Sequence, residues 1–132
     1  MSWAVPEKVL RRMLIERGGV DPTRVSTSTP GNLEDVLPYY RLTTVRGSDD
    51  GLTDSAIVDI EVFHRTRSEA ADEAERIRSV VLDLGGRADS EGHLVDQVTT
   101  SGRPIWLDYR NAAIHRYVAS YEISTRPVYA AG

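Results

Sequence analysis

One stretch of the sequence, residues 54–84, sets what this chain can fold into. Apolar and polar residues alternate from Ala56 to Val62, and this period of two predicts a β-strand with one buried face. From Ala70 onward the apolar residues recur every three or four positions, which predicts an α-helix with one buried stripe. We expect the strand over 55–65 and the helix over 68–84. A strand followed directly by a helix therefore forms the centre of the domain.

The two ends of this helix carry their own sequence signals. Thr66 or Ser68 can cap its start, and Thr66 with Glu69 three residues later matches a capping box. Gly85 and Gly86 can adopt a left-handed backbone conformation that ends a helix. The pattern thus predicts both boundaries as well as the buried face.

The rest of the chain supplies a second helix and further strands. A helix should start at Pro6 and end at Gly18 and Gly19, and strands should cover 39–46, 94–100 and 115–124. Residues 24–29 are either a short edge strand or an extended loop, 47–51 an acidic loop, and 101–104 a break before a short apolar patch. The order predicts an α+β fold: a largely antiparallel sheet of four to five strands with helices packed on one face. We expect a single domain over 1–132, with a flexible C-terminal tail from about residue 127.

Composition excludes several classes of protein. The chain has no cysteine, which excludes disulfides, zinc–thiolate sites and cysteine nucleophiles. No apolar run approaches the roughly 20 residues that span a bilayer, and the first residues lack a signal-peptide pattern, so we expect no membrane association. The net charge of −4 argues against a free-standing nucleic-acid binder, which needs a basic face.

The sequence predicts no catalytic, cofactor-binding or metal-binding residues. The three histidines, His64, His93 and His115, lack the spacing of metal ligands, although a site assembled in space with Asp59 or Asp108 remains an alternative. No serine lies in a nucleophile elbow, and the paired glycines fit helix ends better than a phosphate-binding loop.

Carboxylates and aromatic residues each leave two interpretations. The aspartates of the acidic loop, among them Asp49 and Asp50, could hold a cation weakly but fit a solvated loop better. Asp59 and Glu61 share one strand face. Two neighbouring carboxylates can perform acid–base chemistry, but a polar face in contact with a partner or solvent explains them with fewer assumptions. The rings of Phe63, Tyr117 and Tyr121 could stack on bases, but core and interface packing explains them better in an acidic domain. The residues therefore indicate a compact α+β domain that binds something, with protein as the favoured partner; a small enzyme and a ligand-binding or adaptor module are the competing classes.

Four segments together resemble a known family. Residues 24–38 (RVSTSTPGNLEDVLP), 54–67 (DSAIVDIEVFHRTR), 102–109 (GRPIWLDY) and 116–121 (RYVASY) resemble, in order and spacing, the tail terminator proteins of long-tailed, non-contractile phages of actinobacteria. The resemblance runs from about residue 6 to residue 127, and its motifs are patterns of strand and turn with no catalytic signature.

The resemblance implies a structural role in a virion, without enzymatic activity or cofactors. Tail terminators form six-membered rings on the tail tube, stop its growth and present the surface that joins the head. The implied partners are further copies of the chain, the tail tube protein and head–tail connector proteins, with phage DNA only passing through the channel. The implied location is the tail–neck junction of the virion, and the host cytoplasm during assembly. For such a ring we expect Asp49, Asp50, Asp59 and Glu61 near the lumen or the interfaces; another head–tail joining protein of the neck is the alternative.

Overall fold

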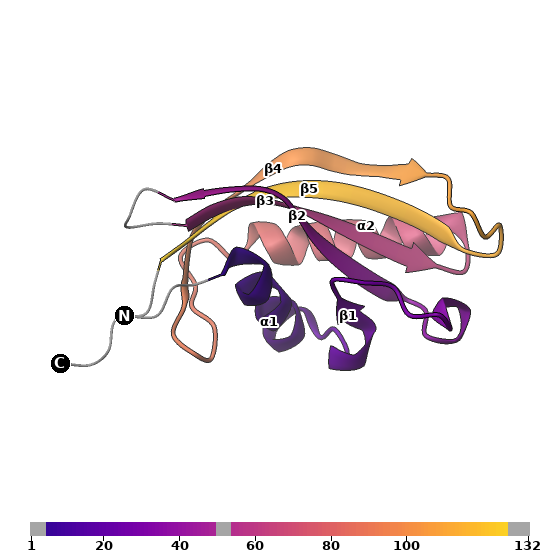
Figure 1. Cartoon of the computed structure of the whole chain (residues 1–132), viewed down its shortest axis with the longest axis horizontal. Helices are drawn as coiled ribbons and strands as arrows, with labels where there is room; N and C mark the ends of the chain where they lie inside the picture. Colours follow the sequence, from indigo (N-terminus) through magenta and orange to yellow (C-terminus); the bar gives the residue numbers. More distant parts are fainter. Residues whose placement is uncertain (1–4, 50–53, 127–132) are drawn as a thin grey trace.

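In residues 5–49 and 54–126, the part of the chain that the computed structural model describes, two α-helices cover one face of a five-stranded sheet (Figure 1). The strands lie in the order β1-β2-β3-β5-β4; β1 pairs with β2 in parallel, and the other neighbours pair antiparallel. The predicted α+β class, the antiparallel sheet and the one-sided helices are confirmed. The elements are α1 (Pro6–Gly18), β1 (Val25–Ser26), β2 (Tyr39–Asp49), β3 (Asp54–His64), α2 (Arg67–Leu82), β4 (Leu94–Leu107) and β5 (His115–Arg126), with 3-10 turns η1 (Pro22–Arg24) and η2 (Leu33–Asp35).

The main core lies between the helices and β3, as the alternation in the sequence predicts. The inward residues of β3 are at most 4% exposed, and they pack in one cluster with the buried stripe of α2. Burying such a stripe stabilises the fold by roughly 25 cal/mol for each Å² of apolar surface removed from water. The residues are Ala56, Val58, Ile60 and Val62 on β3, and Ala70, Ala74, Ile77 and Val81 on α2.

The start of α2 is confirmed, and its end falls earlier than predicted. Thr66 is the N-cap: its hydroxyl accepts the backbone N–H of Glu69 at 3.1 Å and donates to the Glu69 carboxylate at 3.1 Å. The helix ends at Leu82, two residues before the predicted limit. Gly86 has a φ of 83°, which suits glycine, but it serves the turn that leads towards β4.

Two strands are longer than the sequence predicts. β2 continues past residue 46 to Asp49 because its partner β3 pairs with it to the end, so the expected acidic loop is partly strand. β4 runs through the predicted break at 101–104 and reaches Leu107, with register shifts at three places. The strand tolerates Pro104 because β4 is an edge of the sheet, where a missing N–H breaks no ladder. Of the ambiguous segment 24–29, only Val25 and Ser26 form a strand.

A second, smaller apolar cluster covers one end of the other sheet face. Phe63 lies at its centre with 0% exposure and meets the ring of Tyr109 edge to face, with the centroids 5.2 Å apart. Phe63 therefore faces away from Tyr117 and Tyr121, which point towards the helices, so these rings form no common surface for base stacking. The cluster comprises Leu33, Leu37, Tyr39, Phe63 and Ile114.

The loop between α2 and β4 is held to α1 by one buried carboxylate. Asp89 accepts hydrogen bonds from Arg12 at 2.6 Å and from the backbone N–H groups of Glu91 and His93, each at 2.9 Å. Burial alone would raise the pKa of Asp89, but these hydrogen bonds and the Arg12 charge outweigh it and hold the pKa below its usual value of 3.8. The carboxylate is therefore tied into the fold in its ionised form.

This carboxylate should make the fold sensitive to acid. Because the pKa of Asp89 is lower in the folded chain, the stabilisation is complete above the ordinary pKa of 3.8 and is lost as pH falls from there through the folded-state pKa. Asp89→Asn should lower the free energy of unfolding by about 1–3 kcal/mol at pH 7 and by less at pH 3. Urea unfolding at both pH values measures this. The exposed carboxylate of Asp83 provides the control, since Asp83→Asn should change stability by less than about 0.5 kcal/mol at either pH; equal losses in both variants would contradict the role of Asp89.

Candidate functional site

The sheet face that the helices leave uncovered carries charged, hydroxyl and aliphatic side chains. The pairing register places Asp59 between Thr43 of β2 and Ser120 of β5, all on this face. Two positions along β3, Glu61 lies between Arg41 and Val118 in the same way. Side chains from β2, β3 and β5 therefore surround Asp59 and Glu61 on this face.

Both carboxylates have partners on the neighbouring strands. One terminal nitrogen of Arg41 donates to both oxygens of Glu61, at 2.8 and 2.5 Å, and a nitrogen of Arg116 lies 3.8 Å from the same carboxylate. The hydroxyl of Ser120 donates to Asp59. Glu61 is only 12% exposed, so this ion pair is well shielded from water. The pair of carboxylates forms part of a polar network across the sheet.

The other two predicted interface residues lie apart from this network. Asp49 is the last residue of β2, and its backbone pairs with Asp54 at the far end of the strands from Glu61. Asp50 lies outside the described residues, as does the predicted tail from about residue 127. The structure therefore brings Asp59 and Glu61 together and leaves Asp49 at the other end of the same strands.

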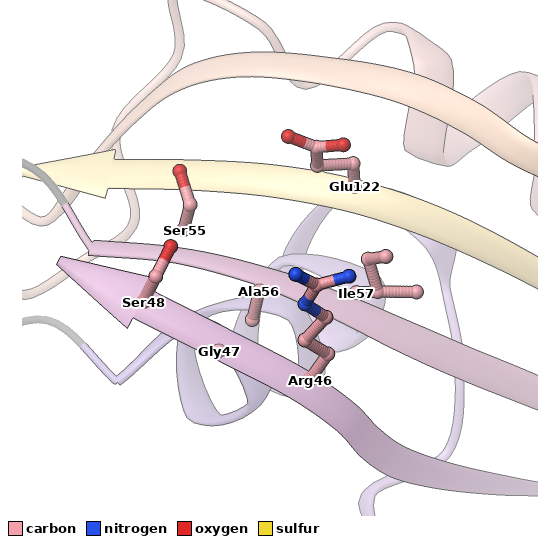
Figure 2. A pocket seen from close by; sticks show the side chains of 7 residues that line it. All are labelled: Arg46, Gly47, Ser48, Ser55, Ala56, Ile57 and Glu122. Carbon is pink, nitrogen blue, oxygen red and sulfur yellow. The ribbon is translucent and has the colours of Figure 1, made fainter.

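A shallow hollow of about 220 Å³ opens on the uncovered face near that other end. Arg46 of β2, Ile57 of β3 and Glu122 of β5 rise from three adjacent strands to form its wall (Figure 2). Gly47, Ser48, Ser55 and Ala56 complete the lining. One cation, one carboxylate and two hydroxyls suit polar contact with another surface.

The three histidines do not come together with Asp59 or Asp108 in a metal site, which was the alternative interpretation of the sequence. His64 and His115 are register partners on β3 and β5, whereas His93 lies in the loop against α1, 3.4 Å from Asp89. Within 5–49 and 54–126 there is no group of three or more His, Cys, Asp or Glu side chains that could hold a metal ion. No helix in these ranges is long and apolar enough to cross a membrane.

The short apolar patch that the sequence predicts after residue 104 is part of the edge strand β4, a continuation of the strand that the sequence did not predict. Ile105 is 56% exposed and Leu107 is 40% exposed, and the register places them beside Val118 and Arg116 on the uncovered face. Their neighbour Trp106 points to the helix side, where Arg67 lies 4.5 Å from its ring. Residues 105–107 are all apolar and so carry no alternation that would assign their faces, and the expected break at 101–104 separated them from the predicted strand.

Shifted pKa values mark contacts between helix and sheet. Burial raises the pKa of Tyr121 to about 12. Burial is also the main reason why the pKa of Tyr40 is raised, and the Tyr40 hydroxyl donates a hydrogen bond to Glu73 at 2.8 Å. Burial opposes the ionised form of Glu73, yet hydrogen bonds from Arg76 and Tyr40 hold its pKa below the usual value. Tyr40, Glu73 and Arg76 thus stabilise the packing of α2 on the sheet. Because these shifted groups lie on the helix side, the uncovered face is the best candidate for a functional surface.

The fold is similar, over nearly the whole chain, to that of a chain in a solved particle. The structure is "Virion of native gene transfer agent (GTA) particle"; the match has a TM-score of 0.61, covers 91% of this chain and 93% of that chain, and has 11% sequence identity. No protein-family model matches the sequence, and no curated protein does. At this identity the similarity shows a common fold.

Proposed function

We propose that this chain is a structural protein of a phage-type virion, the subunit of a ring that caps the tail tube. The observation that carries the proposal is the fold shared with a chain of a gene transfer agent virion over 91% of the present chain. The sequence resemblance to tail terminators points to the same class of protein. An uncovered sheet face of polar and aliphatic side chains suits assembly, and no catalytic group has been identified on it.

The proposed mechanism is occupancy of the tube end. A tube grows because each added ring exposes a surface like the one that it covered, so a ring with a different outer face ends growth. Such a cap needs two unlike faces and contacts between neighbouring copies. The proposed partners are five further copies of the chain, the tail tube protein and the head–tail connectors, with DNA passing through the channel. Asp49, Asp50, Asp59 and Glu61 remain the proposed interface residues, at the tail–neck junction of the virion.

Depletion of the protein tests this function directly. Cells that produce the particle without this chain should assemble tubes of uncontrolled length that fail to join heads, while DNA still fills the heads. Tail length measured by electron microscopy, with and without the protein supplied from a plasmid, gives the result. A titration should show rescue that saturates at about six copies per particle.

Three other outcomes would separate the alternatives. Tails of normal length that fail to join heads would indicate another joining protein of the neck. Tails of normal length that are joined to heads would contradict any assembly role at this junction. Rescue by far fewer copies than one ring would contradict occupancy and favour a catalytic or adaptor role.

A further inference from the structure

At one end of the sheet, three arginines and a tyrosine surround a second hollow, of about 340 Å³. Its wall consists of Thr29, Arg41, Tyr109, Arg110 and Arg116, which we call the arginine hollow. The guanidinium carbons of Arg110 and Arg116 lie 5.8 and 5.3 Å from the centre of the Tyr109 ring. The ring thus stands beside two cations and helps to position them.

The arginine hollow carries more positive charge than its surroundings neutralise. Arg41 and Arg116 share one carboxylate, Glu61, at 2.5 and 3.8 Å. Arg110 is exposed and makes no ion pair with any side chain in 5–49 or 54–126. Glu61 is thus the one carboxylate that makes ion pairs with any of these three guanidiniums among the described residues. Guanidinium groups bind carboxylates and phosphates in a two-pronged geometry. The hollow is suited to an oxyanion from outside the subunit.

The neighbouring surface favours a carboxylate over a nucleic-acid backbone. Glu34 and Asp35 line an adjoining hollow that shares Tyr109 and Arg110 with this one. A strand of phosphates crossing the site would meet these acidic side chains, and the whole chain has a net charge of −4. A single acidic segment can reach the arginines without lying along the acidic wall.

The same chain carries a matching acidic segment at the opposite end of the sheet. Residues 47–54 (GSDDGLTD) contain three aspartates and no basic residue. β2 ends at Asp49, eight residues beyond Arg41, which corresponds to about 26 Å along an extended strand. The connection between β4 and β5, which holds Tyr109 and Arg110, likewise lies at the other end of the sheet from the end of β2 and the start of β3 (Figure 1). Asp49 and Asp54, which border this segment, therefore lie at the opposite end of the sheet from the arginine hollow of their own subunit.

We propose that neighbouring copies of this chain contact each other head to tail, with the acidic segment 47–54 of one copy bound in the arginine hollow of the next. Two different, complementary patches on one molecule make a heterologous contact, which closes into a ring when the rotation between copies allows it. The inference rests on the ring of the proposed function and assigns the residues of its subunit contact. Because the two patches carry opposite charges and attract each other, the affinity of the contact should fall as the salt concentration is raised.

Engineered cysteines give a direct test, because the natural chain has none. In the double variant Asp50→Cys with Arg110→Cys, mild oxidation of the full-length protein at high concentration and low salt should give a ladder of dimers, trimers and larger species. A reducing agent should return the ladder to monomer. Each single-cysteine variant can form dimers at most. In the double variant, alternating 50–50 and 110–110 disulfides can also build a ladder, so the contact additionally requires that peptide mapping find the 50–110 disulfide as the main bond. An equimolar mixture of the two single variants should likewise give mostly the mixed dimer.

Charge reversal provides the second measurement, by sedimentation or light scattering. Arg110→Glu should weaken self-association about tenfold. Adding Asp50→Arg to that variant should restore most of the loss, since the pair of charges is then exchanged. Arg103→Glu makes the same change at an exposed site on β4 and should leave self-association unaltered.

Several results would overturn the inference. A double-cysteine variant that gives no species beyond those of the single variants excludes the contact, as does equal weakening by Arg103→Glu. Binding of a short labelled duplex DNA that Arg110→Glu abolishes, without a ladder, would assign the hollow to nucleic acid. If depletion gives tubes of uncontrolled length but the double-cysteine variant gives no ladder, the capping function is supported and only this subunit contact is excluded.

Discussion

Replacing Ile77 with aspartate is expected to unfold the domain. Ile77 lies in the middle of α2, is 1% exposed and packs in the main core between the helices and the sheet. An aspartate there would place an unpaired charge or a protonated, unpartnered carboxyl group in an apolar surrounding. We expect a loss of at least about 4 kcal/mol, a large part of the 5–15 kcal/mol that stabilises a typical domain. Urea and thermal unfolding followed by circular dichroism measure the loss.

The same new charge at an exposed position on α2 is the control. Ser79 is exposed two residues further along the helix, so Ser79→Asp should change the free energy of unfolding by less than about 0.5 kcal/mol. If Ile77→Asp melts within a degree or two of the natural chain, the assignment of the buried helix face is wrong.

Phe63→Ala should also destabilise the fold strongly, although Phe63 points away from the helices. Its side chain is fully buried in the second cluster and meets Tyr109 edge to face. Removing a buried phenyl ring leaves a cavity and removes the ring contact, which together cost about 3–5 kcal/mol. Tyr109 lines the arginine hollow, so the change should also lower the yield of the cysteine ladder.

A second residue of the same strand and face provides the comparison. Ile57 lies six positions earlier on β3 and is only partly buried, so Ile57→Ala should cost no more than about 1 kcal/mol. Urea unfolding of both variants gives the comparison directly. Similar losses for the two would mean that the second cluster contributes no more than an ordinary strand position.

The parts of the fold that the sequence predicts are those with a complete local signal. On β3 every second residue from Ala56 to Val62 is apolar and buried, on α2 the apolar residues recur every three or four positions, and Thr66 with Glu69 marks the boundary between them. These signals depend on a few neighbouring residues, so they can be found without knowledge of the rest of the chain. The predicted helix end failed because Gly85 and Gly86 lie beyond the last helical turn.

The parts that the sequence could not predict depend on pairing between distant segments. β4 reads as interrupted at Gly102 and Pro104, but its pairing with β5 holds the strand together on both sides of the interruption. Phe63 reads as a half-exposed strand residue because its cover comes from Leu33, Leu37 and Ile114, which lie far away in the sequence.

The candidate surface could be predicted only in part, because it too depends on pairing between strands that are distant in the sequence. The alternation in β3 correctly places Asp59 and Glu61 on one face. Their partners Ser120 and Arg41 depend on the register of two other strands, which no local pattern indicates. The arginine hollow draws its residues from four separate stretches of the chain, so the sequence alone carries no trace of it.

The irregular outer strand β4 has a consequence for what happens when many copies of the chain are present at high concentration. A regular edge strand offers its backbone to any other strand and can seed fibrils, most readily through segments of about six or seven residues. In β4 the register shifts on β5 leave no uninterrupted run longer than the four residues 97–100, and Pro104 removes a further donor. This edge of the sheet is therefore a poor template for fibril growth, even where many copies of the chain are held close together.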